Sequence, residues 1–306
     1  MDLSILIVNW NTHDYLLRCL RKVYSTIGDA SFEVIVVDNA STDDSVAAVR
    51  SQYPQVNLIE NDENLGFARA NNQALAASRG EFVLLLNSDA FVHDGAVDAM
   101  IHHLRSSPDT GIAGCRLVYE DGSLQRSCTA FPTLTSELWL ALWLDRVFPK
   151  SRIFGSYKMT YWDQNDLREV DSVMGACMMV RRAVFDQIGV LDEHFFFSSE
   201  EVDFCYRAKQ AGWKVRYLPD ATATHIWGGS SQQIKTTTFL NLYRYRILFF
   251  RKHYGGLKTF LYKWILALGS LFKSISGLVA SLFTKSITPR SQMRNYWTLL
   301  WSLPSY

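Results

Sequence analysis

Two short polar segments that follow predicted strands carry side chains whose chemistry suits a ligand site. The segment 87–89, Asn-Ser-Asp, follows the apolar run 82–86, and Asp38 follows the apolar run 32–37. A carboxylate at a strand end can hold a hard divalent cation against the phosphates of a ligand, and Asp38 could accept hydrogen bonds from a ribose or a base. The same side chains could instead supply only turn and cap hydrogen bonds. Taken alone, these residues leave both interpretations open.

A second candidate group opens a predicted helix. Glu200, Glu201 and Asp203 stand in its first turn, where acidic side chains are favourable in any helix because they face the positive end of its dipole. The preceding run 195–199, Phe-Phe-Phe-Ser-Ser, would place these carboxylates beside a partly dry pocket, where one of them could work as a general base. His225 ends a later predicted strand, and a lone histidine is more often structural than a ligand.

Strands and helices that alternate along the first hundred residues must position these side chains. Buried strands are predicted at 3–8, 32–37, 56–59 and 82–86, and helices at 12–27, from about 43, and at 67–78. This alternation predicts an α/β fold with a parallel sheet that helices cover on both faces. Ligands of such sheets bind at the carboxyl ends of the strands. Here those ends carry Asn9–Asn11, Asp38–Asn39 and Asn87–Asp89.

The middle of the chain is less regular. After a strand at 112–119, the segment 125–168 has no clear periodicity and is rich in Trp, Tyr and Phe, so we expect a substrate-facing insertion. Regular elements return as strands over 170–180 broken at Gly175-Ala176, a helix at 200–211, and two short strands at 214–217 and 221–225.

Charge is distributed unevenly along the chain. The 306 residues carry 31 Lys and Arg against 30 Asp and Glu, and this balance argues against a nucleic-acid partner. Residues 221–306, however, contain no Asp or Glu and eleven Lys and Arg, which leaves −10 on residues 1–220 and +11 on the rest. The five cysteines are scattered without a CxxC spacing, and the N-terminal residues lack the features of a secretory signal. These features favour a reducing compartment and the cytoplasmic side of a membrane.

The basic region contains a strongly amphipathic helix. Apolar residues from Leu257 to Leu282 recur at alternating steps of four and three, and Lys258, Lys263 and Lys273 fall outside this stripe. Such a helix is typical of an element that lies in the membrane interface, and anionic lipid would explain why acidic residues are missing. A transmembrane span, a heptad seam with another chain, and packing on the protein's own core are the alternatives.

Seven segments, in order over about residues 3–231, together resemble the nucleotide-sugar-dependent glycosyltransferases of family 2, which have the GT-A fold. The match is closest to the bacterial rhamnosyltransferase-like branch. The segments are 5–11 (ILIVNWN), 36–43 (VVDNASTD), 63–69 (ENLGFAR) with 71–72 (NN), 85–89 (LLNSD), 174–181 (MGACMMVR), 200–205 (EEVDFC) and 225–230 (HIWGGS). The resemblance implies a mixed, mostly parallel sheet flanked by helices. It assigns residues 1–231 to a catalytic domain, with 1–110 as the nucleotide-sugar-binding half and 111–231 as the acceptor half, and leaves 232–306 as a basic, membrane-associating helical tail.

The resemblance also implies a donor site, a metal site and a sugar pocket. The implied donor-nucleotide residues are Asn9, Trp10, Asn11, Asp38, Asn39, Asn64, Gly66, Phe67, Arg69, Asn87 and Ser88. Segment 87–89 takes the place of the family's DXD motif with Asn in place of the first Asp, so Asp89 would carry most of the protein's charge on Mg²⁺ or Mn²⁺. His225 matches the histidine that completes the metal site. Gly175, Ala176, Asp203 and Trp227 are implied to shape the donor-sugar and acceptor pocket.

The family's catalytic base lies in the acidic pair at the start of the helix, usually as its second member. That position is Glu201, where the family has Asp, and the longer side chain leaves Glu200 as the alternative. The implied reaction is a single inverting displacement. The resemblance favours dTDP-rhamnose as the donor, with UDP-sugars as alternatives.

The implied acceptor is a growing glycan on a polyprenyl diphosphate in cell-surface polysaccharide synthesis. Segment 236–306 would hold the enzyme as a peripheral protein on the cytoplasmic face of the inner membrane, and its helices could also pair two copies. An oxidoreductase is disfavoured because no GxGxxG follows the first strand, and a P-loop enzyme because no GxxxxGK[ST] occurs. A catalytically inactive sugar-nucleotide-binding scaffold remains the alternative from another class.

Overall fold

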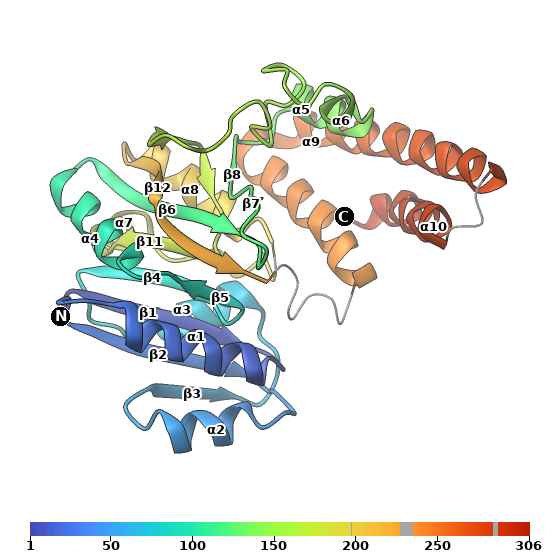
Figure 1. Cartoon of the computed structure of the whole chain (residues 1–306). Helices are drawn as coiled ribbons and strands as arrows, with labels where there is room; N and C mark the ends of the chain where they lie inside the picture. Colours follow the sequence, from blue (N-terminus) through green and yellow to red (C-terminus); the bar gives the residue numbers. More distant parts are fainter. Residues whose placement is uncertain (197, 227–234, 284–286) are drawn as a thin grey trace. The chain divides into compact units, whose positions relative to one another are not determined.

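The computed structural model of the chain describes residues 1–196, 198–226, 235–283 and 287–306 (Figure 1). It divides into two compact units, which we call the sheet unit (Met1–Thr129 with Gln164–Gln233) and the helical unit (Ala130–Asp163 with Ile234–Tyr306). The predicted domain boundary between residues 231 and 232 lies outside the described residues. The aromatic segment 130–163, which we expected within the acceptor half, belongs to the helical unit.

Among the described residues, the sheet unit contains a ten-stranded mixed sheet, which agrees with the mixed sheet that the resemblance implies. Its main path runs β3 (Asn57–Asn61), β2 (Phe32–Asn39), β1 (Leu3–Asn9), β4 (Phe82–Asn87), β11 (Cys177–Arg181), β6 (Thr110–Val118), β12 (Lys214–His225) and β5 (Ala90–Val92). The first four strands in this order are parallel, and β11 is antiparallel to both of its neighbours. The short strands β7 (Leu124–Gln125) and β9 (Arg168–Glu169) pair with β6 and β12, and β8 (Cys128–Thr129) pairs with β10 (Ser172–Val173) apart from the main sheet.

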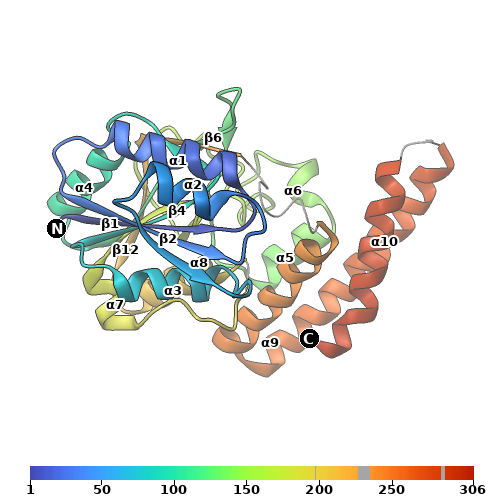
Figure 2. The ribbon, with the colours of Figure 1, turned by 90° about the horizontal axis from the view of Figure 1, so that it is seen from below.

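Helices cover both faces of this sheet. They are α1 (His13–Thr26), α2 (Ser45–Gln52), α3 (Phe67–Ala77), α4 (Ala96–Ser106), α7 (Arg182–Ile188) and α8 (Glu200–Gln210). Figure 2 shows α1 and α3 on opposite sides of the central strands. The alternation of β1 explains one of these contacts, because Ile5 and Ile7 share a buried core with Leu16 and Leu20 of α1.

One prediction about the strands is wrong. The two strands predicted at 214–217 and 221–225 form the single strand β12, which pairs with β6 on both sides of an irregularity. The ladder shifts its register between Leu218 and Thr222, and this gap contains Pro219, which has no N–H to donate. The proline therefore interrupts the pairing without ending the strand. Helices α4 and α7 were not predicted.

The helical unit is built on α9 (Lys235–Phe283), which packs with α5 (Leu134–Ala141) and α10 (Ile287–Ser302). Helix α6 (Leu144–Val147) packs with α5, and the short 3₁₀ helix Leu303–Ser305 packs with α10. A kink interrupts α9 at Gly255, whose φ of 81° suits glycine. Helices α5 and α9 approach closely at Gly269, where an added Cβ would lie 2.6 Å from the Ala141 Cβ. The amphipathic helix predicted over 257–282 is therefore the second half of α9.

The predicted apolar stripe of α9 lies on its exposed side. Its members Leu257, Leu261, Trp264, Leu268, Leu271, Ile275 and Leu278 are 41–73% exposed. The opposite side is buried in the helical unit and includes Tyr262, Leu266 and Lys273. In the part of the chain that the structure describes, none of the helices combines the length and apolar character that a membrane crossing requires.

Candidate active site

The carboxyl ends of β1 and β2 meet in a buried hydrogen-bond network. Asn9 Nδ2 donates to Asp38 Oδ1 at 2.8 Å, and the backbone N–H of Ser41 donates to Asp38 Oδ2 at 2.8 Å. Thr12 Oγ1 donates to Asn9 Oδ1 at 2.6 Å and lies 2.8 Å from Ser88 Oγ. The network thus joins three of the predicted donor residues, Asn9, Asp38 and Ser88. Because their side chains already bond within the protein, they shape this edge of the sheet as well as offering remaining lone pairs to a ligand.

A tight turn before α3 brings a second predicted segment to the same edge. Asn39 Nδ2 donates to the Gly66 carbonyl at 3.3 Å, and Asn64 Oδ1 accepts from the Gly66 N–H at 3.0 Å. Gly66 has a φ of 81°, and an added Cβ would lie 2.5 Å from the Phe196 carbonyl oxygen. The turn therefore requires glycine. It also directs the N–H of Phe67 to the Phe196 carbonyl at 2.8 Å, close in sequence to the predicted base.

The predicted metal ligands lie side by side at the end of β4 and the end of β12. His225 Nε2 is 3.3 Å from Asp89 Oδ1 and 3.4 Å from Asn87 Nδ2. Both Asp89 and His225 are buried, with 6% exposure each. The N–H of Ile226 donates to the Asp89 carbonyl at 3.0 Å, so the backbone also ties the two strand ends together.

Gln125 of β7 fixes the orientation of the histidine ring and was not predicted. Its Oε1 lies 2.7 Å from His225 Nδ1, while its Nε2 donates to the His225 carbonyl at 3.3 Å. The second contact sets the amide orientation, so Oε1 accepts a hydrogen bond from an Nδ1–H. The other nitrogen, Nε2, then lies 3.3 Å from Asp89 Oδ1. This arrangement is typical of a histidine that is held by a neighbouring group to bind a metal.

The remaining site residues come from α8 and from the break in the strands at 174–176. An added Cβ on Gly175 would lie 3.6 Å from Phe67 Cε1 and 3.7 Å from the Glu201 Cβ. The Asn87 N–H donates to the Ala176 carbonyl at 3.0 Å, which ties this segment to the start of the DXD-like triplet. The structure therefore brings Phe67, Gly175 and Glu201 together, and Gly175 leaves space between the other two side chains.

The two glutamates at the start of α8 differ in burial. Glu200 is 5% exposed, and Glu201 is half-buried. Burial, followed by the neighbouring Glu201 carboxylate, raises the pKa of Glu200 well above its usual range. Ser198 and Ser199, which precede the pair, have φ of 79° and 74°, a strained conformation for residues other than glycine. The chain thus enters α8 through a strained turn that immediately precedes Glu200 and Glu201.

Two further predicted site residues, Asp203 and Arg69, differ from the two glutamates in burial and in their partners. Asp203 is fully buried, and its Oδ2 accepts a hydrogen bond from Arg207 Nε at 2.8 Å. Arg207 in turn donates to the carbonyls of Ile188 and Val190. Asp203 therefore anchors α8 to the preceding loop. Arg69 is exposed and lies 3.9 Å from Glu193, whereas Trp10 and Asn11 are partly buried after β1. Trp227 lies outside the described residues.

The residues at the end of β4 fit a divalent cation that is shared with a ligand. Among the described residues, no group of three or more His, Cys, Asp or Glu side chains converges on one point, so these residues form no complete protein cage. The carboxylate of Asp89 and the imidazole Nε2 of His225, which lie 3.3 Å apart, do form a partial site. Mg²⁺ in nucleotide sites usually takes one or two protein carboxylates and completes its coordination with phosphates and water. The donor set therefore fits the predicted Mg²⁺ or Mn²⁺.

Comparison with known proteins identifies the family. The profile of glycosyl transferase family 2 matches residues 4–189. N-acetylglucosaminyl-diphospho-decaprenol L-rhamnosyltransferase of Mycobacterium tuberculosis is 27% identical over 303 residues, which cover 95% of this chain and 96% of that protein. Low-salt glycan biosynthesis hexosyltransferase Agl10 of Haloferax volcanii is 27% identical over 247 residues, which cover 79% of this chain and 71% of that protein.

The fold agrees with this family. The mannosyltransferase PcManGT from Pyrobaculum calidifontis, solved in complex with GDP-Man and Mn²⁺, superimposes with a TM-score of 0.62 at 16% identity, over 99% of this chain and 86% of that chain. This likeness confirms the predicted GT-A fold. The matched segment 4–189 contains the network at β1 and β2, the turn at Gly66 and the DXD-like triplet. The chain therefore belongs to glycosyl transferase family 2 and is a glycosyltransferase of the rhamnosyltransferase-like type.

Proposed function

We propose that this enzyme transfers rhamnose from dTDP-rhamnose to a glycan on a polyprenyl diphosphate, with inversion at the anomeric carbon. The observation that carries the proposal is the alignment with the M. tuberculosis rhamnosyltransferase, whose name specifies a rhamnosyl donor group and a diphospho-decaprenol acceptor and whose length this chain covers almost completely. A UDP-sugar donor is the alternative within the same class. The nucleotide would lie against the network of Asn9 and Asp38, with its diphosphate toward Asp89.

In this proposal each side chain has a defined task. Glu201 accepts the proton of the acceptor hydroxyl as that oxygen attacks the anomeric carbon. Asp89 and His225 would hold Mg²⁺ or Mn²⁺, which offsets the charge that develops on the departing nucleoside diphosphate. Gly175 leaves room for the donor sugar beside Glu201.

Glu200 is better suited to hold a proton than to remove one. Its raised pKa favours the neutral form, and a neutral neighbour lets Glu201 carry the negative charge that a base requires. This difference supports Glu201 over Glu200 as the base. Asp203, which is bonded to Arg207, would position α8 and with it both glutamates.

A panel of dTDP-, UDP- and GDP-sugars with Mg²⁺ or Mn²⁺ tests the donor and the activity together, by measuring binding and slow hydrolysis. We expect dTDP-rhamnose to bind best and chelation to stop transfer. Glu201→Gln should abolish turnover while it leaves donor binding near normal, and Glu200→Gln should retain most of the activity. Wild-type turnover by Glu201→Gln would refute the assignment of the base. Donor binding without hydrolysis or transfer under any condition would favour an inactive scaffold.

The helical unit would hold the enzyme on an anionic membrane surface. The exposed side of α9 carries a continuous apolar stripe, and residues 221–306 carry eleven cationic residues and no acidic ones. A partner of complementary chemistry must therefore be apolar at its centre and anionic at its rim, which describes the lipid interface better than a second copy of a basic helix.

Liposome flotation with anionic vesicles tests this contact. Replacing both Leu268 and Ile275 with Ser should weaken flotation, since these side chains are 62% and 53% exposed and the change leaves the buried side of α9 intact. Val190→Ser, at a 47% exposed position of the sheet unit, is the matched control and should float like the wild type. Concentration-dependent dimerisation that the double variant abolishes, without any flotation of the wild type, would show that a second copy covers the stripe.

A further inference from the structure

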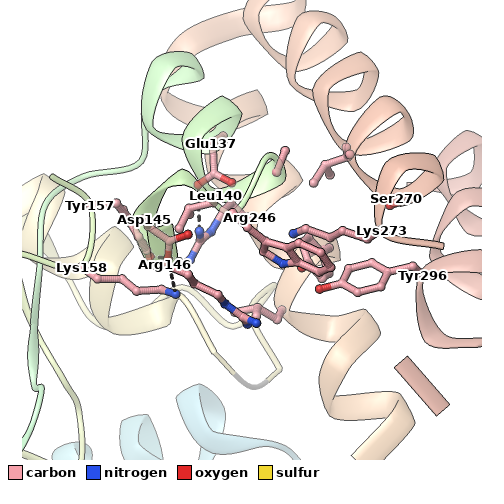
Figure 3. A pocket seen from close by; sticks show the side chains of 16 residues that line it. Glu137, Leu140, Asp145, Arg146, Tyr157, Lys158, Arg246, Ser270, Lys273 and Tyr296 are labelled. Atoms are coloured by element: carbon pink, nitrogen blue, oxygen red, sulfur yellow. Dashed lines mark hydrogen bonds and ion pairs between the residues drawn. The ribbon is translucent and has the colours of Figure 1, made fainter. Parts of the chain in front are cut away.

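The helical unit contains a cavity of about 240 Å³ that the proposed catalytic residues do not line (Figure 3). Side chains from α5, α6, α9 and α10 and from the segment 157–158 surround it. Sites for drug-sized ligands usually occupy about 300–1,000 Å³. This cavity therefore suits a small polar group better than a complete nucleotide sugar. Its charged lining residues are Glu137, Asp145, Arg146, Lys158, Arg246 and Lys273.

Both carboxylates in the lining already have a cationic partner. Arg246 Nη1 lies 2.8 Å from Glu137 Oε1, in a pair whose side chains are 12% and 3% exposed. Lys158 Nζ lies 2.9 Å from Asp145 Oδ2. Figure 3 shows these two pairs on the same side of the cavity. The remaining two cations, those of Arg146 and Lys273, have no carboxylate within 4 Å among the described residues, so the lining has an excess of positive charge.

Lys273 provides the strongest indication that the excess positive charge of the cavity serves to bind an anion. It is 9% exposed, and its Nζ contacts only aromatic rings among the described residues, 5.0 Å from the centre of Tyr296 and 5.7 Å from that of Trp143. Trp143 Nε1 is buried beside it without a hydrogen-bond acceptor in the described part of the chain. Figure 3 shows Lys273 and Tyr296 turned into the same space from α9 and α10. A buried ammonium group and a buried N–H donor, both without acceptors in the part of the chain that the structure describes, fit an anion.

The cavity adjoins the apolar stripe of α9. Phe272, which is 43% exposed, stands edge-on to Trp143 with 5.8 Å between the ring centres. Trp143 therefore contacts Phe272, the neighbour of stripe residue Leu271, and also lines the cavity. The stripe and Lys273 occupy opposite sides of α9, and a helix with its side chains is about 10–12 Å wide. If the stripe rests in the acyl region, the cavity lies at the depth of the lipid phosphates.

We propose that this cavity binds the diphosphate group of the polyprenyl-linked acceptor, an inference that rests on the proposed function. The two cations without carboxylate partners, Arg146 and Lys273, would pair with the phosphate oxygens, and Trp143 Nε1 would donate to one of them. The apolar stripe would take up the polyprenyl chain beside Phe272. The helical unit would thereby select the carrier lipid, while the sheet unit selects the donor.

Vesicle binding by the full chain tests the inference. Neutral phosphatidylcholine vesicles would contain either polyprenyl diphosphate or the same amount of polyprenol, and inorganic diphosphate would serve as the soluble probe. We expect tighter binding to the diphosphate vesicles, partial competition by inorganic diphosphate, and about a tenfold or greater loss with Lys273→Met, since a hydrogen bond to a charged group has this effect. Lys258→Met removes the same charge from an exposed position of the same helix and should change binding less than twofold.

The outcomes separate the inference from its alternatives. Equal binding to the diphosphate and polyprenol vesicles, or equal losses with Lys273→Met and Lys258→Met, would overturn it. Tight binding of inorganic diphosphate with no preference between the two vesicles would also overturn it, in favour of a site for free phosphate. Glu201→Gln should bind the diphosphate vesicles like the wild type. If the wild-type enzyme prefers the diphosphate vesicles but transfers no sugar with any donor, the proposed function fails and the proposed anion site stands. Unfolding curves of each variant show whether a loss of binding follows from a loss of structure.

Discussion

The buried ammonium group of Lys273 should destabilise the protein when no anion is bound. The side chain is nine-tenths buried, and the groups that face it are the cations of Arg146 and Lys158 and the carboxylates of Asp145 and Glu137. Burial, followed by the charge of Arg146, lowers the pKa of Lys273 from 10.5 to about 8. Lys273→Met keeps an unbranched chain in the same space and removes the charge.

The size and the sign of the effect follow from this shift. Because a change of one in pKa corresponds to about 1.4 kcal/mol, the lowering of the Lys273 pKa from 10.5 to about 8 sets an upper limit of about 3.5 kcal/mol on the effect. Below pH 8 Lys273 is charged in both the folded and the unfolded state, and only the folded state carries the free-energy cost of removing the charged group from water. Between pH 8 and 10.5 the folded state loses the proton first, so the wild type becomes relatively more stable as the pH rises. Lys273→Met should therefore be about 2–3 kcal/mol more stable than the wild type at pH 7, and this gain should vanish toward pH 10.5.

Urea unfolding of both proteins at pH 7, 8, 9 and 10 measures the difference, because groups that titrate alike in both proteins cancel. Lys258→Met is the control, and a surface change of this kind should stay within about 0.5 kcal/mol. Saturating inorganic diphosphate should stabilise the wild type and narrow the gap to Lys273→Met. A variant less stable than the wild type at pH 7, or a gain that is the same at every pH, would refute the reasoning.

Four further substitutions test the sheet unit. Gln125→Leu should weaken Mn²⁺ binding in the presence of the donor by about 10–100-fold while the fold persists, as titration calorimetry would show, because His225 loses its orienting partner. Gly66→Ala should destabilise the protein by about 1–3 kcal/mol in urea unfolding, because its φ is 81° and the new Cβ would clash with a backbone carbonyl. Gly175→Ala should leave stability nearly unchanged but raise KM for the donor in steady-state assays, because its contacts at 3.6–3.8 Å are ordinary. Glu200→Gln should gain stability over the wild type at pH 8 but not at pH 4, since a raised pKa gives the wild type stability that is lost as the pH rises.

Strict alternation of strands and helices made the first half of the sheet predictable. The predicted strand 3–8 appears as β1, and its carboxyl end faces that of β2 with Asn9 beside Asp38 in register. The pairing of Asp89 with His225 was implied by resemblance and agrees with their separation of 3.3 Å. The residue pattern within each strand could not predict this pairing, because the two residues follow or end strands that are far apart in the sequence. Their roles, and that of Glu201, stay predictions.

Gln125 shows why part of the site escaped prediction. It lies in a strand of two residues, within a segment without periodicity, and its partner is 100 residues away. No spacing signals such a contact. Asp203 is the converse case. It shares a helix turn with the predicted base, and only the structure shows that it is fully buried against Arg207.

The apolar stripe of α9 shows the limit of periodicity in another way. A repeat of four and three residues establishes which side chains share a face, but it does not say which face is buried. In a helix packed on its own core the stripe would point inward. Here the inward side of α9 carries Tyr262, Ser270 and Lys273, and the stripe is exposed. Gly269 accounts for part of this orientation, because its close approach to Ala141 requires a small residue on the buried side.

An exposed stripe of this length implies a covering partner. The 22 residues from Leu257 to Leu278 span roughly 32 Å of helix at about 1.5 Å per residue. Soluble proteins rarely expose continuous apolar patches of more than a few hundred Å². Burying polar and charged groups on the other side of the same helix, Lys273 among them, is unfavourable unless those groups also gain a partner. One lipid with an apolar chain and a diphosphate head would satisfy both sides of α9, whereas a second copy of the helix would cover the stripe and leave Lys273 without an anion.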